Sequence, residues 1–95
     1  MIISGLKKDD NKLKWDLLPM EEIEDIIRVL MFGEKKYQAW NWQKVDDGEK
    51  RYLNAAYRHM ASIQKKEALD EETNLSHYSH ALCSLLFAFW HSRNK

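Results

Sequence analysis

Apolar residues recur at helical spacing along three stretches of the chain. The first stretch begins at Pro19, a residue suited to a first helical turn, and ends near Gly33, which is placed to terminate a helix. Acidic residues beginning at Glu21 suit the positive end of a helix dipole. Its apolar side chains share one face and are Ile23, Ile26, Ile27, Leu30 and Met31. The pattern predicts an amphipathic helix, followed by a short helix or turn over residues 34–40.

Two further helices are predicted, from about Glu49 to Ala68 and from about Leu75 to Ser92. The apolar side of the earlier one consists of Tyr52, Leu53, Ala56, Tyr57, Met60 and Ile63. Because successive helical residues turn by about 100°, the last helix has two distinct faces. Its broad apolar face consists of Tyr78, Leu82, Leu85, Leu86 and Phe89, and the opposite face of His77, His80, Ala81, Ser84, Ala88 and His91. We expect a buried helix whose small face lets another helix or a ligand come close.

The fold class follows from these helices and from the small number of turn-forming residues. Only three glycines and one proline interrupt 95 residues, which favours an all-α fold over an all-β one. We therefore predict a single domain over residues 1–95, a small helical bundle of three to four helices. Residues 1–12 form a flexible or loosely packed N-terminal segment in this prediction. A chain of this size often gains stability by self-association, so we also expect a homo-oligomer.

Charge and cysteine content narrow the possible partners. The 15 basic and 15 acidic residues balance, so the chain has no strong field to attract nucleic acid or an anionic membrane. No apolar run approaches the roughly 18 residues of a membrane-spanning helix. Cys83 is the single cysteine, which excludes an internal disulfide and fits a reducing cytoplasm. Its apolar neighbours predict a small core residue rather than a reactive thiol.

Histidines and carboxylates supply the candidate metal chemistry. His77 and His80 are one helical turn apart and project from the same side of the last helix. His59 on the preceding helix and the loop carrying Asp70 and Glu72 could add ligands for Mn²⁺, Mg²⁺, Co²⁺ or Zn²⁺. Three readings of the histidine pair stay open, namely core residues, a metal pair and the floor of a pocket for an anionic ligand. The spacing alone favours the structural reading.

Aromatic and basic residues raise the possibility of a nucleotide ligand. The aromatic side chains outside a clear helical stripe are Trp15, Tyr37, Trp40 and Trp42, which either stack on a base or pack loops over the bundle. Lys14 and Lys36 are the basic residues best placed to converge on phosphates, although most of the lysines read as a solvated surface. The chain has no glycine-rich phosphate loop and no nucleophile motif.

Four motifs together resemble a known family. They are "KWDLLP" (14–19), "FGEKKYQAWNW" (32–42), "RHM" (58–60) and "LDEETNLSHYSHALC" (69–83). Their order and spacing over residues 12–90 resemble the phage-associated dATP/dGTP diphosphohydrolase family, the MazZ-type proteins. The acidic loop reads "DEETN" where many relatives have Asp-Pro-Glu-Ser-Gly, a difference that keeps Asp70 and Glu72.

That family is similar in turn to the MazG-like all-α nucleoside triphosphate pyrophosphohydrolases. Those enzymes hold Mg²⁺ or Mn²⁺ with acidic motifs on two helices. The corresponding positions here fall on His77 and His80, and near Arg58 and His59. Because Mg²⁺ prefers oxygen ligands, a histidine-rich site favours Mn²⁺, Co²⁺ or Zn²⁺, or holds no metal.

The resemblance implies an enzyme that hydrolyses dATP or dGTP to the monophosphate and pyrophosphate in the cytoplasm, the host cytoplasm if a phage encodes the chain. A divalent metal (Mn²⁺, Mg²⁺ or Co²⁺) would be held by Asp70, Glu72, His77 and His80. The catalytic residues would be Glu72, His59 and Arg58. The substrate-binding residues would be Lys14, Trp15, Lys36, Tyr37, Asn41 and Trp42.

Two other classes of function remain open at this point. One is a non-catalytic phage sponge on the same scaffold, which sequesters a cyclic-nucleotide or ADP-ribose-type defence signal. It would bind through Arg58, His59, His77 and the aromatic residues, at a subunit interface. The other is a structural or partner-binding helical module, which predicts no nucleotide affinity and gives no reason for residues 32–42.

Overall fold

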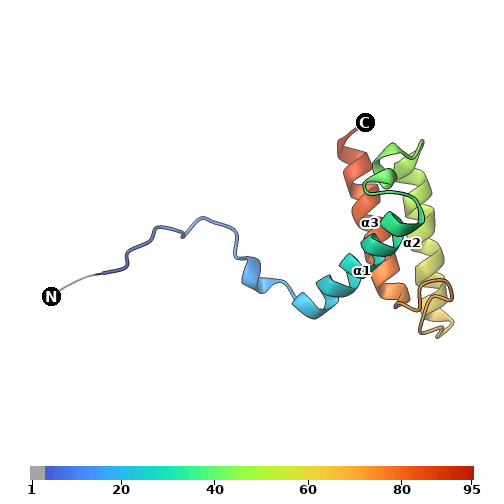
Figure 1. Cartoon of the computed structure of the whole chain (residues 1–95), viewed down its shortest axis with the longest axis horizontal. Helices are drawn as coiled ribbons and strands as arrows, with labels where there is room; N and C mark the ends of the chain where they lie inside the picture. The colour runs from blue at the N-terminus through green and yellow to red at the C-terminus, as the bar shows by residue number, and fades with distance from the viewer. Residues whose placement is uncertain (1–3) are drawn as a thin grey trace.

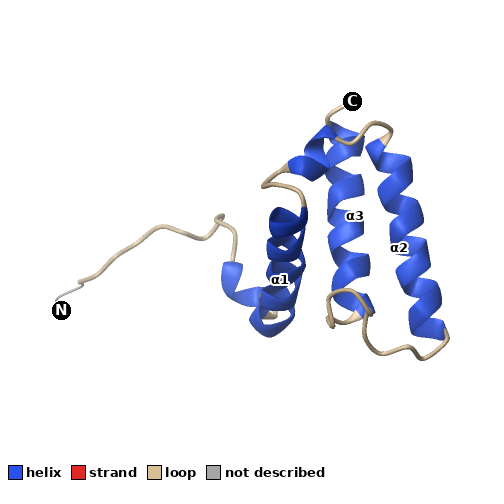
Figure 2. Cartoon of the chain, turned by 45° about the vertical axis from the view of Figure 1, so that its right-hand side comes forward, coloured by secondary structure: helices blue, strands red, loops and turns tan. Residues whose placement is uncertain are grey.

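The computed structural model describes residues 4–95, which form helices and connecting loops. The elements in chain order are η1 (Trp15–Leu17), α1 (Met20–Lys36), η2 (Asn41–Lys44), α2 (Gly48–Gln64) and α3 (His77–Arg93). The helices α2 and α3 form an antiparallel pair, and α1 lies along the other side of α3 (Figure 2). Bridge pairing in this part of the chain is limited to Leu69 and Ser76. The prediction of a small all-α bundle is confirmed, with α3 as its central helix.

The close packing of α2 on α3 uses the small face predicted for the last helix. Ala81, Cys83 and Ala88 of α3 and Ala56 of α2 are the buried hydrophobic residues of the described chain. Small side chains let two helix backbones approach, which is why α2 packs here. The predicted close approach is confirmed, and so is Cys83 as a core residue.

The broad apolar face of α3 is exposed, so the prediction of a buried helix is wrong for this face. Tyr78 is 64% exposed, Leu82 48% and Phe89 58%, and Leu85 and Leu86 are also exposed. The reason is geometric, because α2 occupies the small face and α1 covers only one flank (Figure 2). A large apolar surface of the central helix is left open.

Two predicted helix ends are also wrong. Gly33 lies inside α1, which continues to Lys36 before the Tyr37 amide bonds back to the Gly33 carbonyl at 2.9 Å. Residues 34–40 are therefore divided between the last turn of α1 and a turn that leads into η2. The second helix stops at Gln64 rather than Ala68, because the backbone turns left-handed at Lys66, where φ is 63°.

Contacts at the C-terminal end of α3 hold η2 in place. We call the contacts of Phe87, Trp90 and His91 with Trp42 the clamp. The His91 Nε2 donates a hydrogen bond to the Trp42 carbonyl oxygen at 2.8 Å. Gly48 lets this ring fit, since a Cβ at that position would lie 2.3 Å from it. The Trp42 ring stacks on Phe87 with centroids 4.3 Å apart and meets Trp90 edge-on at 5.3 Å. The contacts fix the segment that carries two predicted substrate-binding residues.

The N-terminal part of the described chain stands away from the bundle. Residues 4–14 contain no helix and extend from the start of α1 into solvent (Figure 1). None of the three residues of η1 is buried. Residues 1–3 of the predicted loosely packed segment lie outside the described residues. Within residues 4–95, no helix is both long and apolar enough to cross a bilayer.

Candidate functional site

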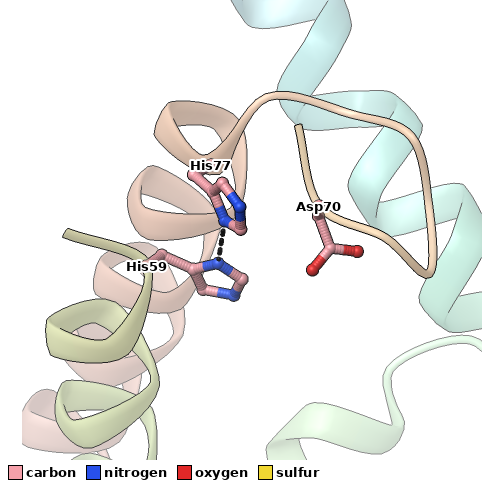
Figure 3. Close-up of side chains that lie close together, drawn as sticks. All are labelled: His59, Asp70 and His77. Carbon is pink, nitrogen blue, oxygen red and sulfur yellow. Dashed lines mark hydrogen bonds between the residues drawn. The ribbon is translucent and has the colours of Figure 1, made fainter. Parts of the chain in front are cut away.

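Three histidines gather where the N-terminal turn of α3 faces the C-terminal half of α2. His59 comes from α2, and His77 and His80 come from the first turn of α3. The Nδ1 atoms of His59 and His77 lie 3.0 Å apart (Figure 3). The rings of His59 and His80 stack with centroids 4.7 Å apart and planes inclined by 16°. Spacing along the sequence predicted the pair on α3, and the fold adds His59 to it.

Asp70 completes a group that can hold a metal ion. One ligand atom from each of His59, Asp70 and His77 lies within 4.8 Å of the other two, and Figure 3 shows the carboxylate facing the two rings. Two ligand atoms at neighbouring positions of a six-coordinate ion, each about 2.1 Å from it, are about 3.0 Å apart. The separation of the two Nδ1 atoms matches that edge. Two imidazoles and a carboxylate suit Mn²⁺, Co²⁺ or Zn²⁺ better than Mg²⁺.

The acidic loop holds the Asp70 carboxylate in a fixed orientation. Its Oδ1 accepts hydrogen bonds from the Thr73 amide at 2.9 Å and from the Thr73 hydroxyl at 3.0 Å. The Asn74 amide donates to the Asp70 carbonyl at 2.8 Å, with Asn74 in a left-handed conformation at φ 61°. Burial opposes ionisation, but the hydrogen bonds from Thr73 and the nearby His80 more than offset it, so the pKa of Asp70 is lowered. The site therefore presents an ionised, oriented carboxylate.

Thr73 also fixes the tautomer of His80. The His80 Nε2 lies 2.6 Å from the Thr73 Oγ1, whose only proton is donated to Asp70. The Nε2 of His80 must therefore carry a proton and donate it to Thr73, which leaves Nδ1 without one. The Asp70 Oδ1 is 3.7 Å from the same Nε2. In this arrangement His80 orients the carboxylate through Thr73.

Burial keeps two of these histidines neutral. It lowers the pKa of His59 below its usual 6.5, and the nearby His80 and His77 lower it further. The pKa of His80 is lowered as well, chiefly by burial, with Asp70 opposing the shift. A metal ligand must offer a free lone pair, which a neutral imidazole has on one ring nitrogen. The Nδ1 atoms of His59 and His77 share a hydrogen bond, so a metal ion bound by both would replace its proton.

A cavity of about 570 Å³ adjoins this cluster, between α1, η2 and α3. His80 and Glu72 line the end nearest the cluster, and aliphatic and aromatic side chains line most of the rest. Four predicted substrate-binding residues, Lys36, Tyr37, Asn41 and Trp42, line this cavity. Volume and lining are typical of small-ligand sites.

The remaining predicted site residues lie in other places. The Glu72 carboxylate pairs with the Lys36 ammonium at 2.9 Å and is not part of the group of three ligands. Arg58 is exposed on α2, one residue before His59. Lys14 and Trp15 belong to the N-terminal part that stands away from the bundle, and neither lines the cavity.

Sequence reasoning missed Thr73 entirely. It stands three residues after Asp70, the spacing at which a threonine closes a turn on an aspartate. That signal could have placed Thr73 against Asp70. It could not have shown His80 as the third member of the network, because helix α3 reaches Thr73 only in the folded chain.

Comparison with known proteins identifies relatives of this chain. The family model described as dATP/dGTP diphosphohydrolase, N-terminal, matches residues 3–95. A curated dATP/dGTP diphosphohydrolase of Salmonella phage PMBT28 is 37% identical over 95 residues, covering 98% of this chain and 31% of that protein. The chain thus spans about a third of the length of this relative. No solved structure matches significantly.

Proposed function

Because the chain belongs to the family of dATP/dGTP diphosphohydrolase N-terminal domains, we propose that it hydrolyses a purine deoxynucleoside triphosphate to the monophosphate and pyrophosphate. The family resemblance read from the four motifs is thereby confirmed. The phage relative is named for this activity, and the chain matches about a third of its length. The observation that supports it most is the group of His59, Asp70 and His77 beside a cavity of nucleotide size.

The proposed metal ligands are His59, Asp70 and His77. This set differs from the one predicted from the sequence, since His59 enters and Glu72 and His80 leave. A divalent cation bound there would supply charge neutralisation and Lewis-acid activation for phosphoryl chemistry. His80 and Thr73 hold the carboxylate in place, which keeps the ligand set preorganised.

The cavity is the proposed site of the purine. Tyr37 is exposed and offers an aromatic surface, whereas Phe87 already covers one face of Trp42. The Asn41 carboxamide also lines the cavity and has both a donor and an acceptor for the edge of a base. We assign stacking to Tyr37, base-edge contacts to Asn41, and the cavity wall to Trp42.

Lys36 and Glu72 are proposed to exchange partners when substrate binds. The ammonium and the carboxylate pair across the cavity lining, and the hydrogen bond that Lys36 donates to Glu72 raises the pKa of Lys36. A triphosphate carries more negative charge than one carboxylate and would compete for this lysine. Glu72 would then be free to accept a proton from the attacking water, as its predicted catalytic role requires. Arg58 is exposed and would meet the phosphates from the α2 side.

The test is metal-dependent release of pyrophosphate from dATP or dGTP by the wild-type chain and by His59→Gln and His77→Gln. We expect both variants to lose metal affinity and activity together, by tens-fold or more, because each removes a ligand. Tyr57→Phe, an exposed change two residues before His59, is the matched control and is expected to behave as wild type. Equal metal affinity and turnover in His59→Gln would remove this site from the proposal.

Binding without turnover is the second candidate function. It is favoured by one observation, that the group of possible metal ligands in the described chain contains a single carboxylate. A sponge would hold its nucleotide in the same cavity and return it unchanged. A Glu72→Gln variant separates the two, since it should reduce turnover in an enzyme while leaving a sponge able to bind.

A further inference from the structure

The segment before α1 carries large apolar side chains that are exposed in the structure. We call residues 13–18 the arm. Trp15 is 70% exposed, Leu17 is 78% exposed, and Leu13 and Leu18 are exposed as well. The arm also carries Lys14, which the sequence analysis placed at the phosphates. In Figure 1 it points away from the bundle that holds the cavity.

A second unpartnered apolar surface lies on α3. We call it the open face, and it consists of Tyr78, Leu82, Leu85, Leu86 and Phe89. No Asp, Glu, Lys or Arg occurs from His77 to Ser92, so this helix has no charged face to turn toward water. An apolar stripe of this kind on a helix normally packs against another element. One side of α3 therefore lacks its cover.

Few apolar side chains of residues 4–95 are fully buried. The buried hydrophobic residues in this range are three alanines and Cys83, and no residue of α1 is buried. A core of such small side chains contributes much less than the leucines and aromatics that remain outside it. The open face and the arm hold the large apolar side chains from which a core is usually built.

The cavity opens onto the same surface. Ile27 and Met31 of α1 and Leu86 of the open face line the cavity and are also exposed. The open face therefore meets the cavity at Leu86. A segment that lies along this side of the open face reaches the edge of the cavity.

We propose that two copies of this chain associate by exchanging arms, and that the arm of each copy lies along the open face of the other. With Trp15–Leu17 in the turn η1, the arm is about 16 Å long, and the open face from Tyr78 to Phe89 is about 17 Å long. With 15 basic and 15 acidic residues the chain has no net charge, so charge repulsion between two copies does not oppose their association. The arrangement is a two-fold interface in which each copy gives and receives the same surfaces.

The exchange supplies residues that the cavity lacks in one subunit. Trp15 would close the apolar mouth over the base, and Lys14 would approach the phosphates beside Lys36. This step rests on the proposed function, whereas the association itself does not. Neither Trp15 nor Lys14 lines the cavity of its own copy in the structure.

Cross-linking between two singly substituted chains tests the geometry without nucleotide or metal. A Leu17→Cys chain and a Leu86→Cys chain are mixed and oxidised, and the product is separated on a non-reducing gel. The native Cys83 does not interfere, because burial raises its pKa to about 12 and keeps the thiol protonated. We expect a mixed disulfide dimer, and none when Leu17→Cys is paired with Asn54→Cys on the exposed side of α2.

Light scattering gives the state of the unmodified chain. A mass of two subunits with the 17–86 cross-link supports arm exchange. A monomer at high concentration overturns the proposal, and so does a dimer that gives no more 17–86 product than the Asn54 control.

Mixing two differently substituted chains tests whether the arm of one copy contributes to the nucleotide site of the other. Trp15→Ala damages the arm and His77→Gln damages the cluster, so each variant alone should bind nucleotide poorly. A mixed dimer has one site with both parts intact, and an equal mixture should regain about a quarter of the wild-type sites. No recovery together with a confirmed cross-link overturns the role of Trp15 and leaves the dimer standing. Absence of any turnover or binding in the wild type would overturn the proposed function instead.

Discussion

Replacing Thr73 by valine removes one hydroxyl from the centre of the candidate site and changes the side-chain volume little. That hydroxyl donates to Asp70 at 3.0 Å and accepts hydrogen bonds from His80 at 2.6 Å and from the Leu75 amide at 3.2 Å. Valine leaves two donors without their acceptor and leaves Asp70 with one hydrogen bond fewer. Because Asp70 and His80 are only 21% and 13% exposed at the side chain, water replaces these bonds incompletely.

The expected losses of stability and metal affinity follow from these lost contacts. Leaving partly buried donors unsatisfied costs about 1–2 kcal/mol of unfolding free energy, at the lower end of the usual range. For a domain of this size, each kcal/mol corresponds to a melting temperature lower by about 4–8 °C. Loss of a residue that orients a metal ligand lowers metal affinity by about 10–100-fold.

The assay is calorimetric titration of the Thr73→Val and Thr73→Ser variants with Mn²⁺, beside a thermal melt of each. Serine keeps the hydroxyl, so Thr73→Ser should retain most of the metal affinity and stability. A merely structural role would lower the melting temperature of Thr73→Val and leave its Mn²⁺ affinity at the wild-type value. That result would refute the argument that Thr73 holds the carboxylate for a metal.

Three further outcomes are expected. Gly48→Ala places a methyl group against the His91 ring, and it should destabilise the fold by about 1–3 kcal/mol in a denaturant titration; an unchanged midpoint would contradict the clamp. The pKa values of His59 and His80 are lowered from 6.5 in the folded chain. At pH values between these lowered pKa values and 6.5, the unfolded chain therefore binds more protons than the folded chain. Stability should therefore fall as the pH drops through 6.5 and stop falling below those pKa values, which a series of melts from pH 8 downward, compared with a His59→Gln and His80→Gln double variant, would show or disprove. Cys83 should resist a thiol reagent in the native protein and react on unfolding, since its thiol is buried with a pKa raised to about 12; rapid native labelling would contradict its place in the core.

The spacing of apolar residues predicted the helices because each amphipathic stripe is formed by residues that are close together in the sequence. They failed at helix ends, where a single backbone conformation decides the boundary, as with the left-handed Lys66. They also failed for the open face of α3. Amphipathicity shows which side chains share a face, and it predicted that the small face around Ala81 lets another helix come close. It does not show that the broad apolar face would then remain exposed.

The candidate site was predictable to a similar degree. His77 and His80 could be paired from their spacing along one helix. The grouping of His59 with Asp70 depends on the turn that brings α2 back against α3, which spacing does not encode. Glu72 was predicted as a metal ligand from its place in the acidic loop, yet its side chain points to Lys36 at 2.9 Å, and its role stays a prediction.

One chromatogram tests the central claim most directly. The purified chain is incubated with dNTPs, NTPs and cyclic dinucleotides in the presence of Mn²⁺ or Mg²⁺, and free nucleotides are separated by ion exchange before and after heat denaturation. A diphosphohydrolase with the histidine-rich site described above should convert dATP or dGTP to its monophosphate well beyond one equivalent, and faster with Mn²⁺. Nucleotide that disappears and returns intact on heating would contradict catalysis and identify a sponge, and nucleotide that stays untouched throughout would contradict the nucleotide site itself.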